Sequence, residues 1–329
     1  MAVERTDYRK FLDPRVVSEL KDLNLRARLI VEGFLIGLHR SPFHGFSVEF
    51  KEHRAYNPGD EIRWIDWKVY ARTNRFYVRK FEEETNLKAY ILFDVSKSMD
   101  YPEKGVSKFE YARSLAAALS YLFFFQKDAV GLLAFSDRLH TFVPPSASKA
   151  NLHRVLIELT KLKPQGTTAP WKVFAELAER MKKRGLVILI SDLYMEGERI
   201  LRAMRNFRYR QHEVLVFQVL SPEDMNLPGF PVLLRDLETR EEVSYDPDSM
   251  RVAYRKKLSD FVDGMKKELR KDRIDFELLT TDLGFERALY FYLHNADPEV
   301  TEEDINRLPA VIVNLLVLRI GEEESRFLL

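Results

Sequence analysis

The strongest constraint on the fold is an alternation, between residues 87 and 295, of short apolar runs with longer segments of helical periodicity. The runs at 87–93, 129–135 and 186–190 are apolar at nearly every position, which indicates strands buried on both faces. Such strands, separated by helices, are typical of a mostly parallel sheet covered by helices on both sides. We therefore predict a doubly wound α/β domain. Its strands are expected at 87–93, 129–135, 139–143, 186–190, 213–220 and 274–280, with a hairpin at 232–237 and 242–245, and its helices at about 107–125, 149–162, 170–183, 198–209, 248–271 and 285–294.

An appendage is expected before this domain. Asp13-Pro14 is a helix-start signal, and one helix is predicted to follow it, with a single apolar face. Residues 45–84 alternate apolar and polar side chains around an Asn-Pro-Gly-Asp turn, which favours strands. No flexible linker separates them from residue 87, so this segment is expected to pack on the core. The predicted division is 1–86, a helix plus a strand-rich segment; 87–295, the α/β domain; and 296–329, a tail. The apolar face of the predicted helix consists of Val16, Leu20, Leu23, Ala27, Ile30 and Phe34.

Composition excludes several classes of protein. The chain of 329 residues has 52 Lys and Arg against 51 Asp and Glu, so no overall basic field attracts nucleic acid. It has no cysteine, which excludes disulfides, thiolate metal sites and cysteine nucleophiles. The charged N-terminus does not resemble a secretory signal, and the apolar stretch 309–320 is shorter than the roughly 20 residues that span a bilayer. We expect a soluble, cytoplasmic protein without membrane insertion.

Polar side chains follow the first predicted strand in a D-x-S-x-S sequence, Asp94, Ser96 and Ser98. Ligands of open parallel sheets bind beyond the carboxyl ends of the strands, which is where these residues are expected. Carboxylate and hydroxyl oxygens are hard donors that suit Mg²⁺, Mn²⁺ or Ca²⁺. The alternative is a capped turn, in which Asp94 and Ser96 bind only local backbone N–H groups.

Two further segments strengthen the metal-site interpretation. Thr167 follows a glycine in a loop before a predicted helix, and Asp192 follows the apolar run 186–190. If that strand lies beside the first, Asp192 reaches the same rim as Asp94, and the Thr167 loop must arch over it. The set then offers three hydroxyls and two carboxylates, enough to neutralise a divalent cation while leaving room for water or a ligand.

These five residues, in this order, resemble the metal-ion-dependent adhesion site of von Willebrand factor A domains, a likeness that extends over about 87–294. The resemblance implies that Ser96, Ser98 and Thr167 bind the metal directly. It implies that Asp94 and Asp192 hold the metal's water ligands. The open coordination position would accept a carboxylate from a partner protein.

A narrower resemblance rests on residues 37–41 (GLHRS), 54–63 (RAYNPGDEIR), 65–67 (IDW) and 71–73 (ART). These motifs resemble the bacterial MoxR-associated, von Willebrand factor A-like family, which is catalogued as a domain of unknown function. The resemblance covers about 12–295 and implies a non-enzymatic partner of a MoxR-type AAA+ ATPase, or of its client, in assembly or maturation of other proteins. The pair Gln165-Gly166 stands where a double glycine is common in the family, and the tail from 299 has no counterpart in it.

Three other functions remain open as alternatives. Asp94 beside a divalent metal could be the nucleophile of a Mg²⁺- or Mn²⁺-dependent hydrolase or phosphotransferase, although Ser96 stands where such enzymes of the haloacid dehalogenase type carry a second aspartate. Asp60 and Asp66 could be paired catalytic carboxylates, but the arginines around them favour structural ion pairs.

The chain has neither a G-x-x-x-x-G-K-[ST] nor a G-x-G-x-x-G motif, so ATP hydrolysis is not expected. A stripe of four arginines could bind nucleic acid, but a solvated helix face explains the stripe without a ligand, and the balanced net charge offers no wider basic field. The stripe consists of Arg199, Arg202, Arg205 and Arg208.

Overall fold

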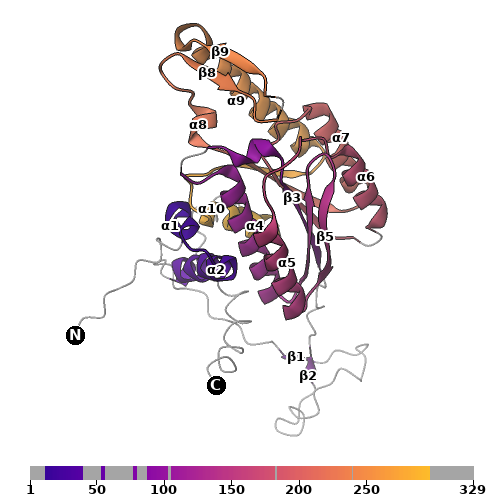
Figure 1. The fold of residues 1–329 in the computed structure, drawn as a ribbon. Coiled ribbons are helices and arrows are strands. Elements are labelled where there is room, and N and C mark those ends of the chain that lie inside the picture. The colour runs from indigo at the N-terminus through magenta and orange to yellow at the C-terminus, as the bar shows by residue number, and fades with distance from the viewer. Residues whose placement is uncertain are drawn as a thin grey trace, which may run out of the picture.

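The computed structural model describes residues 12–39, 53–55, 77–79 and 87–296, apart from 103–104, 182–183 and 239. Its centre is a six-stranded sheet with helices on both faces (Figure 1). The strand order is β10-β7-β6-β3-β4-β5, and every neighbouring pair is parallel except β4 and β5. The predicted doubly wound, mostly parallel sheet is therefore confirmed. The strands are β3 (Lys88–Asp94), β4 (Ala129–Phe135), β5 (Leu139–Ser146), β6 (Leu186–Ser191), β7 (Glu213–Leu220) and β10 (Asp275–Thr280).

The order of these strands places a topological switch point at the centre of the sheet. β3, the first strand along the chain, lies between β4 and β6, so the chain winds outward from β3 in both directions. In sheets with this 3-2-1-4-5-6 order, ligands bind beyond the carboxyl ends of the two strands at the switch. The pair β3 and β6 occupies that position here.

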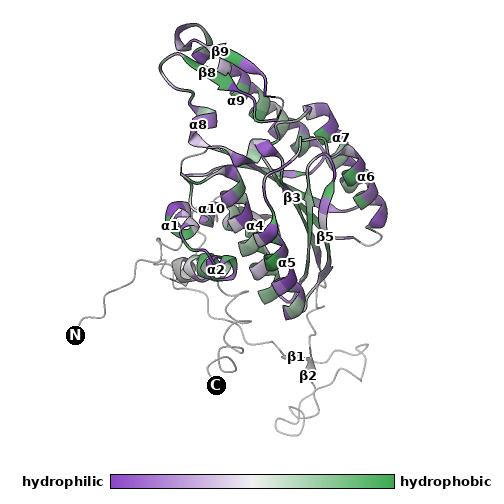
Figure 2. Ribbon diagram, viewed as in Figure 1, coloured by the Kyte–Doolittle hydropathy of each residue, from purple (hydrophilic) through white to green (hydrophobic). Residues whose placement is uncertain are grey.

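The two faces of the sheet bury separate hydrophobic clusters. Ile91 and Phe93 of β3 pack into one cluster and Leu92 into the other, as the two-residue period of a strand requires. Figure 2 shows the strands mostly in the hydrophobic colour. The first face is covered by α4 (Lys108–Phe125), α5 (Lys149–Lys161) and α10 (Glu286–Ala296), and α2 (Leu23–His39) packs on α4. The second face is covered by α6 (Trp171–Arg180), α7 (Gly197–Tyr209) and α9 (Pro247–Lys271).

The N-terminal segment forms two helices where one was predicted. The Asp13 carboxylate caps α1 (Pro14–Ser18) by accepting from Arg15 N, as the sequence indicated. A second cap at Asp22, whose Oδ1 accepts from Asn24 N at 2.9 Å, starts α2. The break changes the helical phase, so Val17 is buried and Val16, which was predicted on the apolar face, is 42% exposed.

Helix α2 belongs to the core of the α/β domain. Ala27, Ile30 and Phe34 are fully buried in the cluster that also contains the apolar face of α4. Arg26 adds polar contacts: its Nη2 donates to Ser18 O at 2.8 Å, and its Nη1 lies 3.0 Å from the Glu110 carboxylate on α4.

An insertion between β7 and β10 projects beyond the sheet (Figure 1). It consists of α8 (Pro222–Met225), the antiparallel pair β8 (Val232–Arg235) and β9 (Glu242–Tyr245), and the N-terminal part of α9. The predicted hairpin is thus confirmed. Figure 2 shows hydrophobic residues on both strands, and Leu233 and Val243 are 61% and 54% exposed.

The strand-rich appendage is described only at β1 (His53–Ala55) and β2 (Tyr77–Arg79), which pair antiparallel. Both strands lie within the segment 45–84, which was predicted to contain strands, whereas the predicted Asn-Pro-Gly-Asp turn at 57–60 lies outside the described residues. The packing of this segment on the core and the tail beyond 296 also lie outside them, so the division at 86 and 295 stays a prediction.

Candidate functional site at the switch point

The site lies where β3 and β6 end side by side. β3 ends at Asp94, and Asp192 directly follows β6. The two strands are paired in parallel from Ala89 with Leu186 to Phe93 with Ile190, so both aspartates emerge on one rim of the sheet. The metal-site interpretation required these two strands to be adjacent in the sheet.

Asp94 is fully buried, and both of its carboxylate oxygens accept hydrogen bonds. Oδ1 accepts from Ser96 N at 2.8 Å, and Oδ2 accepts from Ser191 Oγ at 2.6 Å. The first is the local bond of the capped-turn alternative, and the second reaches across to β6. Burial, together with the negative charge of Asp192, raises the pKa of the Asp94 carboxyl to about 7. The electrostatic environment of this rim therefore disfavours the ionisation of both carboxylates and favours the binding of a cation.

The two serines of the D-x-S-x-S sequence lie together. Ser96 Oγ is 3.0 Å from Ser98 Oγ, at the start of the short 3-10 helix η3 (Lys97–Asp100). Ser96 is buried and Ser98 is half-buried. The alternate spacing thus brings the two hydroxyls together beside the Asp94 carboxylate.

The loop that carries Thr167 and Thr168, called the threonine loop below, is hydrogen-bonded to the same rim. Gln165 N donates to Val95 O at 2.6 Å, and Lys97 N donates to Gly166 O at 3.2 Å. Gly166 has a φ of +78°, and a Cβ added there would lie 2.5 Å from Ser136 Oγ, so the loop requires glycine on two grounds.

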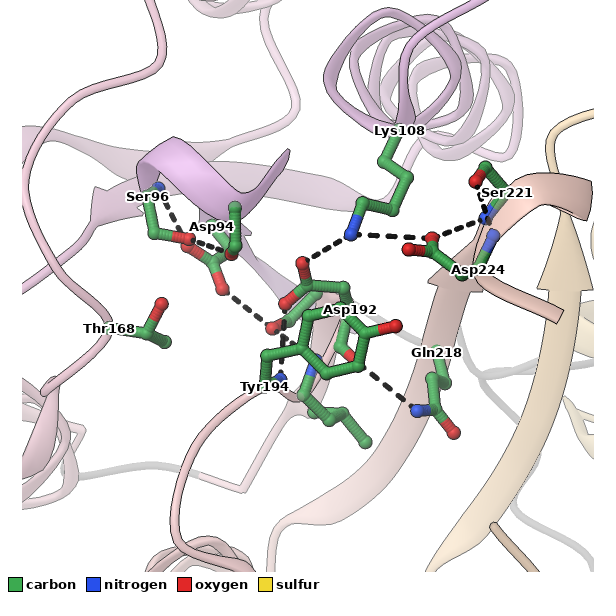
Figure 3. Close-up of polar contacts among 12 residues, drawn as sticks. Asp94, Ser96, Lys108, Thr168, Asp192, Tyr194, Gln218, Ser221 and Asp224 are labelled. Carbon is green, nitrogen blue, oxygen red and sulfur yellow. Dashed lines mark hydrogen bonds and ion pairs between the residues drawn. The ribbon is translucent and has the colours of Figure 1, made fainter. Parts of the chain in front are cut away.

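The two adjacent threonines of this loop differ in their exposure to solvent and in their contacts. The predicted ligand, Thr167, is exposed. Thr168 is half-buried and donates through its backbone N–H and its hydroxyl to Glu238. Figure 3 includes Thr168 on the same side of the rim as Ser96.

The site contains a buried lysine that was not predicted from the sequence. Lys108, at the start of α4, is 1% exposed; its Nζ lies 2.8 Å from Asp192 Oδ2 and 3.4 Å from Asp224 Oδ2 (Figure 3). The same ammonium lies 4.4 Å from the centre of the Tyr194 ring. No local pattern marks a lysine for this position, since its partners are 84 and 116 residues away in the chain.

Asp224 was also missed, although it has a sequence signal. Ser221 and Asp224 form a capping box at the start of α8: Ser221 Oγ accepts from Asp224 N, and Asp224 Oδ2 accepts from Ser221 N. The spacing S-x-x-D is a helix-start pattern. The cap orients the Asp224 carboxylate toward Lys108.

The charges of this network do not cancel. Asp94, Asp192 and Asp224 oppose one ammonium, Lys108, which leaves two uncompensated negative charges among these four groups when all are ionised. Buried charge of this kind is costly unless a cation is bound. A divalent ion supplies the matching charge, and the carboxylate and hydroxyl oxygens of the rim are of the hard type that Mg²⁺ and Mn²⁺ prefer. Within the described ranges, no three His, Asp or Glu side chains converge as a metal-binding group, so any such site depends on the hydroxyls.

Three of the four arginines of the stripe on α7 make contacts within the chain. Arg205 Nε lies 2.6 Å from Asp272 Oδ2, Arg199 Nε lies 2.7 Å from Glu196 Oε2, and Arg208 donates to a backbone carbonyl. These contacts favour the ion-paired helix face over a phosphate-binding surface. None of the described helices combines the length and the hydropathy that a bilayer span needs.

The strand order defines a doubly wound, mostly parallel α/β protein of the von Willebrand factor A-like class. A model of the family described as "Protein of unknown function DUF58" matches residues 52–261. The chain belongs to this family, which confirms the family predicted from the sequence motifs. Proteins of Mycobacterium tuberculosis and Mycobacterium bovis, both described as uncharacterized, are 31% identical to it over 241 residues, which cover 71% of this chain and 75% of theirs.

Solved structures with a similar backbone include three proteins of low sequence identity. BatB from Bacteroides thetaiotaomicron is 15% identical, with a TM-score of 0.39, over 71% of this chain and 99% of that one. An aerotolerance-related membrane protein from Bacteroides fragilis is 17% identical, with a TM-score of 0.45, over 68% of this chain and 100% of that one. The SpRpn10 VWA domain is 11% identical, with a TM-score of 0.35, over 62% and 94%.

Proposed function

We propose that this protein is a non-enzymatic interaction protein that binds one divalent cation at the switch point and uses it to recognise a carboxylate of a partner protein. Ser96, Ser98 and Thr167 would bind the cation directly, and Asp94 and Asp192 would hold its water ligands. Mg²⁺ is the first candidate, with Mn²⁺ and Ca²⁺ as alternatives. When bound, the cation supplies an open coordination position to which an anionic side chain can be attracted.

The observation that carries the proposal is the excess of buried negative charge at the rim. Two fully buried aspartates end adjacent strands, and Lys108 compensates only part of their charge and that of Asp224. Two serine hydroxyls lie beside Asp94 and can complete an oxygen shell. Each carboxylate oxygen has a second lone-pair direction, so the existing hydrogen bonds leave room for water-mediated contact.

Calorimetry on the full chain tests the cation site. Asp94→Ala is expected to weaken Mg²⁺ or Mn²⁺ affinity at least tenfold without loss of the fold. Asp260→Ala is the matched control, because Asp260 is an exposed aspartate on α9, an element that contributes no residue to the proposed cation site. Equal affinities in the wild type and Asp94→Ala would reject the site.

The strongest rival function is a Mg²⁺- or Mn²⁺-dependent hydrolase or phosphotransferase with Asp94 as the nucleophile. Its carboxylate is fully buried and bonded at both oxygens, whereas a nucleophile needs an oxygen that faces the substrate. We expect only background turnover of ATP and generic phosphate esters with either metal. Turnover that disappears in Asp94→Asn would favour the rival instead.

The proposed partner is a MoxR-type AAA+ ATPase, or a client protein that this ATPase remodels. This part of the proposal rests on the family resemblance of the sequence motifs. A pull-down from a native lysate, with Mg²⁺ and with chelator, tests it against Asp94→Ala bait. An AAA+ ATPase retained by the wild type with Mg²⁺ and lost in the other two conditions is the expected result; equal retention in all three would contradict it.

A further inference from the structure

A glutamate from the projecting hairpin is bound at the rim by the threonine loop. Glu238, in the turn between β8 and β9, accepts from Thr168 N at 3.0 Å through Oε2 and from Thr168 Oγ1 at 2.7 Å through Oε1. The two residues are 70 positions apart in the chain. One carboxylate therefore receives two donors from one residue, which is the pattern of a small anion-binding site.

The rim holds this donor pair in place independently of the hairpin. The loop before Thr168 is bonded to Val95 and Lys97 through backbone groups, and Gly166 packs against Ser136. The donors are thus fixed to the carboxyl ends of β3 and β4. Their acceptor belongs to a two-stranded sheet that has no strand pairing with the main sheet among the described residues.

The contact can exchange with another carboxylate. Thr168 and Glu238 are both half-buried, so solvent and a competing anion can reach them. Hydrogen bonds to a partly exposed carboxylate contribute a modest net free energy, because water replaces them when they break, so another carboxylate can compete with Glu238.

We infer that the N–H and hydroxyl of Thr168 form a carboxylate-binding subsite for an acidic side chain of a partner protein, and that Glu238 occupies this subsite in the free chain. The inference deepens the proposed carboxylate recognition, but its donors are protein groups and need no cation. A partner's aspartate or glutamate must displace Glu238, and the affinity for the partner is reduced by the fraction of molecules in which Glu238 is bound.

The subsite can be tested by NMR on the full chain labelled with ¹⁵N-threonine. The probe is the peptide Ac-Gly-Glu-Gly-NH₂, with Ac-Gly-Gln-Gly-NH₂ as the neutral control. In Glu238→Ala the Thr168 amide resonance is expected to move from its wild-type position and then to titrate with the glutamate peptide at least ten times more tightly than in the wild type. Glu241→Ala removes the same charge from the same turn and is expected to behave as the wild type.

Variants of Thr168 test the donors. In the Glu238→Ala background, Thr168→Ser is expected to retain binding of the glutamate peptide, and Thr168→Val to weaken it several-fold through loss of the hydroxyl. An unchanged Thr168 resonance in Glu238→Ala, or equal affinity for the two peptides, would overturn the inference. So would loss of binding in Thr168→Ser.

The titration is repeated in EDTA and in Mg²⁺, because the subsite and the cation site can fail separately. Binding of the peptide in EDTA supports the subsite even if calorimetry finds no Mg²⁺ affinity, which would reject only the proposed function. Intact Mg²⁺ affinity without any shift at Thr168 would reject the subsite alone.

Discussion

Lys108 and Asp192 form an ion pair that is almost completely withdrawn from solvent: their Nζ and Oδ2 atoms lie 2.8 Å apart, and the two side chains are 1% and 0% exposed. The pair joins the start of α4 to the end of β6, and Asp224 connects it to α8. Asp192 is thereby held in position by a cation that belongs to the chain. This relationship determines how the rim responds to substitution and to added metal.

Replacement of Lys108 by methionine is expected to destabilise the metal-free protein by about 3–5 kcal/mol, because it leaves buried carboxylates without a counter-ion. Mg²⁺ should then raise the melting temperature of the variant more than that of the wild type. Differential scanning calorimetry in EDTA and in Mg²⁺ measures both effects. Lys161→Met, which removes an exposed lysine paired with Glu158, is the control and should change little. A variant as stable as the wild type in EDTA would show that the pair is not a stabilising element.

Replacement of Asp94 by asparagine should have the opposite sign in the absence of metal. The substitution removes a buried negative charge close to Asp192 while keeping a similar shape, so the melting temperature in EDTA is expected to rise. For a domain of this size each kcal/mol corresponds to about 2–4 °C. The increase in melting temperature that Mg²⁺ causes in the wild type should disappear. A decrease in EDTA would contradict this expectation, and it would indicate that the hydrogen bonds accepted by the ionised carboxylate outweigh its repulsion from Asp192.

Glu110 gives a pH-dependent test of how α2 is held on α4. Burial opposes ionisation of this carboxyl, but Arg113 and Arg26 outweigh it and hold its pKa below the usual value. A carboxyl with a lowered pKa in the folded state stabilises the protein above its unfolded pKa, and this contribution is lost as the pH falls through the folded pKa. Glu110→Gln is therefore expected to cost about 1 kcal/mol at pH 7, with the difference from the wild type shrinking below about pH 4.

Urea unfolding of the wild type and Glu110→Gln from pH 3 to pH 8 measures this difference. Glu176→Gln on α6 is the matched control, because Glu176 is exposed and its oxygen lies 3.7 Å from Arg180. A pH-independent cost for Glu110→Gln would assign the effect to packing and not to charge.

Substitution by alanine is expected to change the free energy of unfolding in opposite directions at Gly166 and at Gly264. Gly166→Ala should destabilise by at least about 1 kcal/mol, because φ is positive and the added Cβ would meet Ser136 Oγ at 2.5 Å. Gly264 lies inside α9, and a Cβ there meets no atom within 4 Å, so Gly264→Ala should stabilise by about 0.5–1 kcal/mol. Chemical denaturation compares the two. Metal affinity should fall only in Gly166→Ala, since that loop carries Thr167; an equal fall in both would contradict the assignment of the loop to the rim.

The predicted strands agree with the structure because their signal is local. The run 129–135 is apolar at nearly every position and bounded by polar residues, and β4 has the same bounds as the prediction. The helix from Lys108 was predicted from Ser107, whose hydroxyl does cap it by accepting from Glu110 N. The prediction of a single N-terminal helix was wrong, because the apolar spacing continues through the break at Asp22. An aspartate inside a periodic segment can either face solvent or cap a new helix, and the sequence does not show which hydrogen bonds its side chain makes.

The sequence by itself determined the class of fold, the family and the position of Asp94, Ser96 and Ser98 at the carboxyl end of one strand, because strand burial, motif spacing and turn chemistry act over a few neighbouring residues. Only the tertiary structure decided that Lys108 lies against Asp192 and that Glu238 lies against Thr168. These pairs are 84 and 70 residues apart. Their contact depends on how helices and a hairpin pack around the sheet, and packing of distant segments leaves no periodic pattern in the chain.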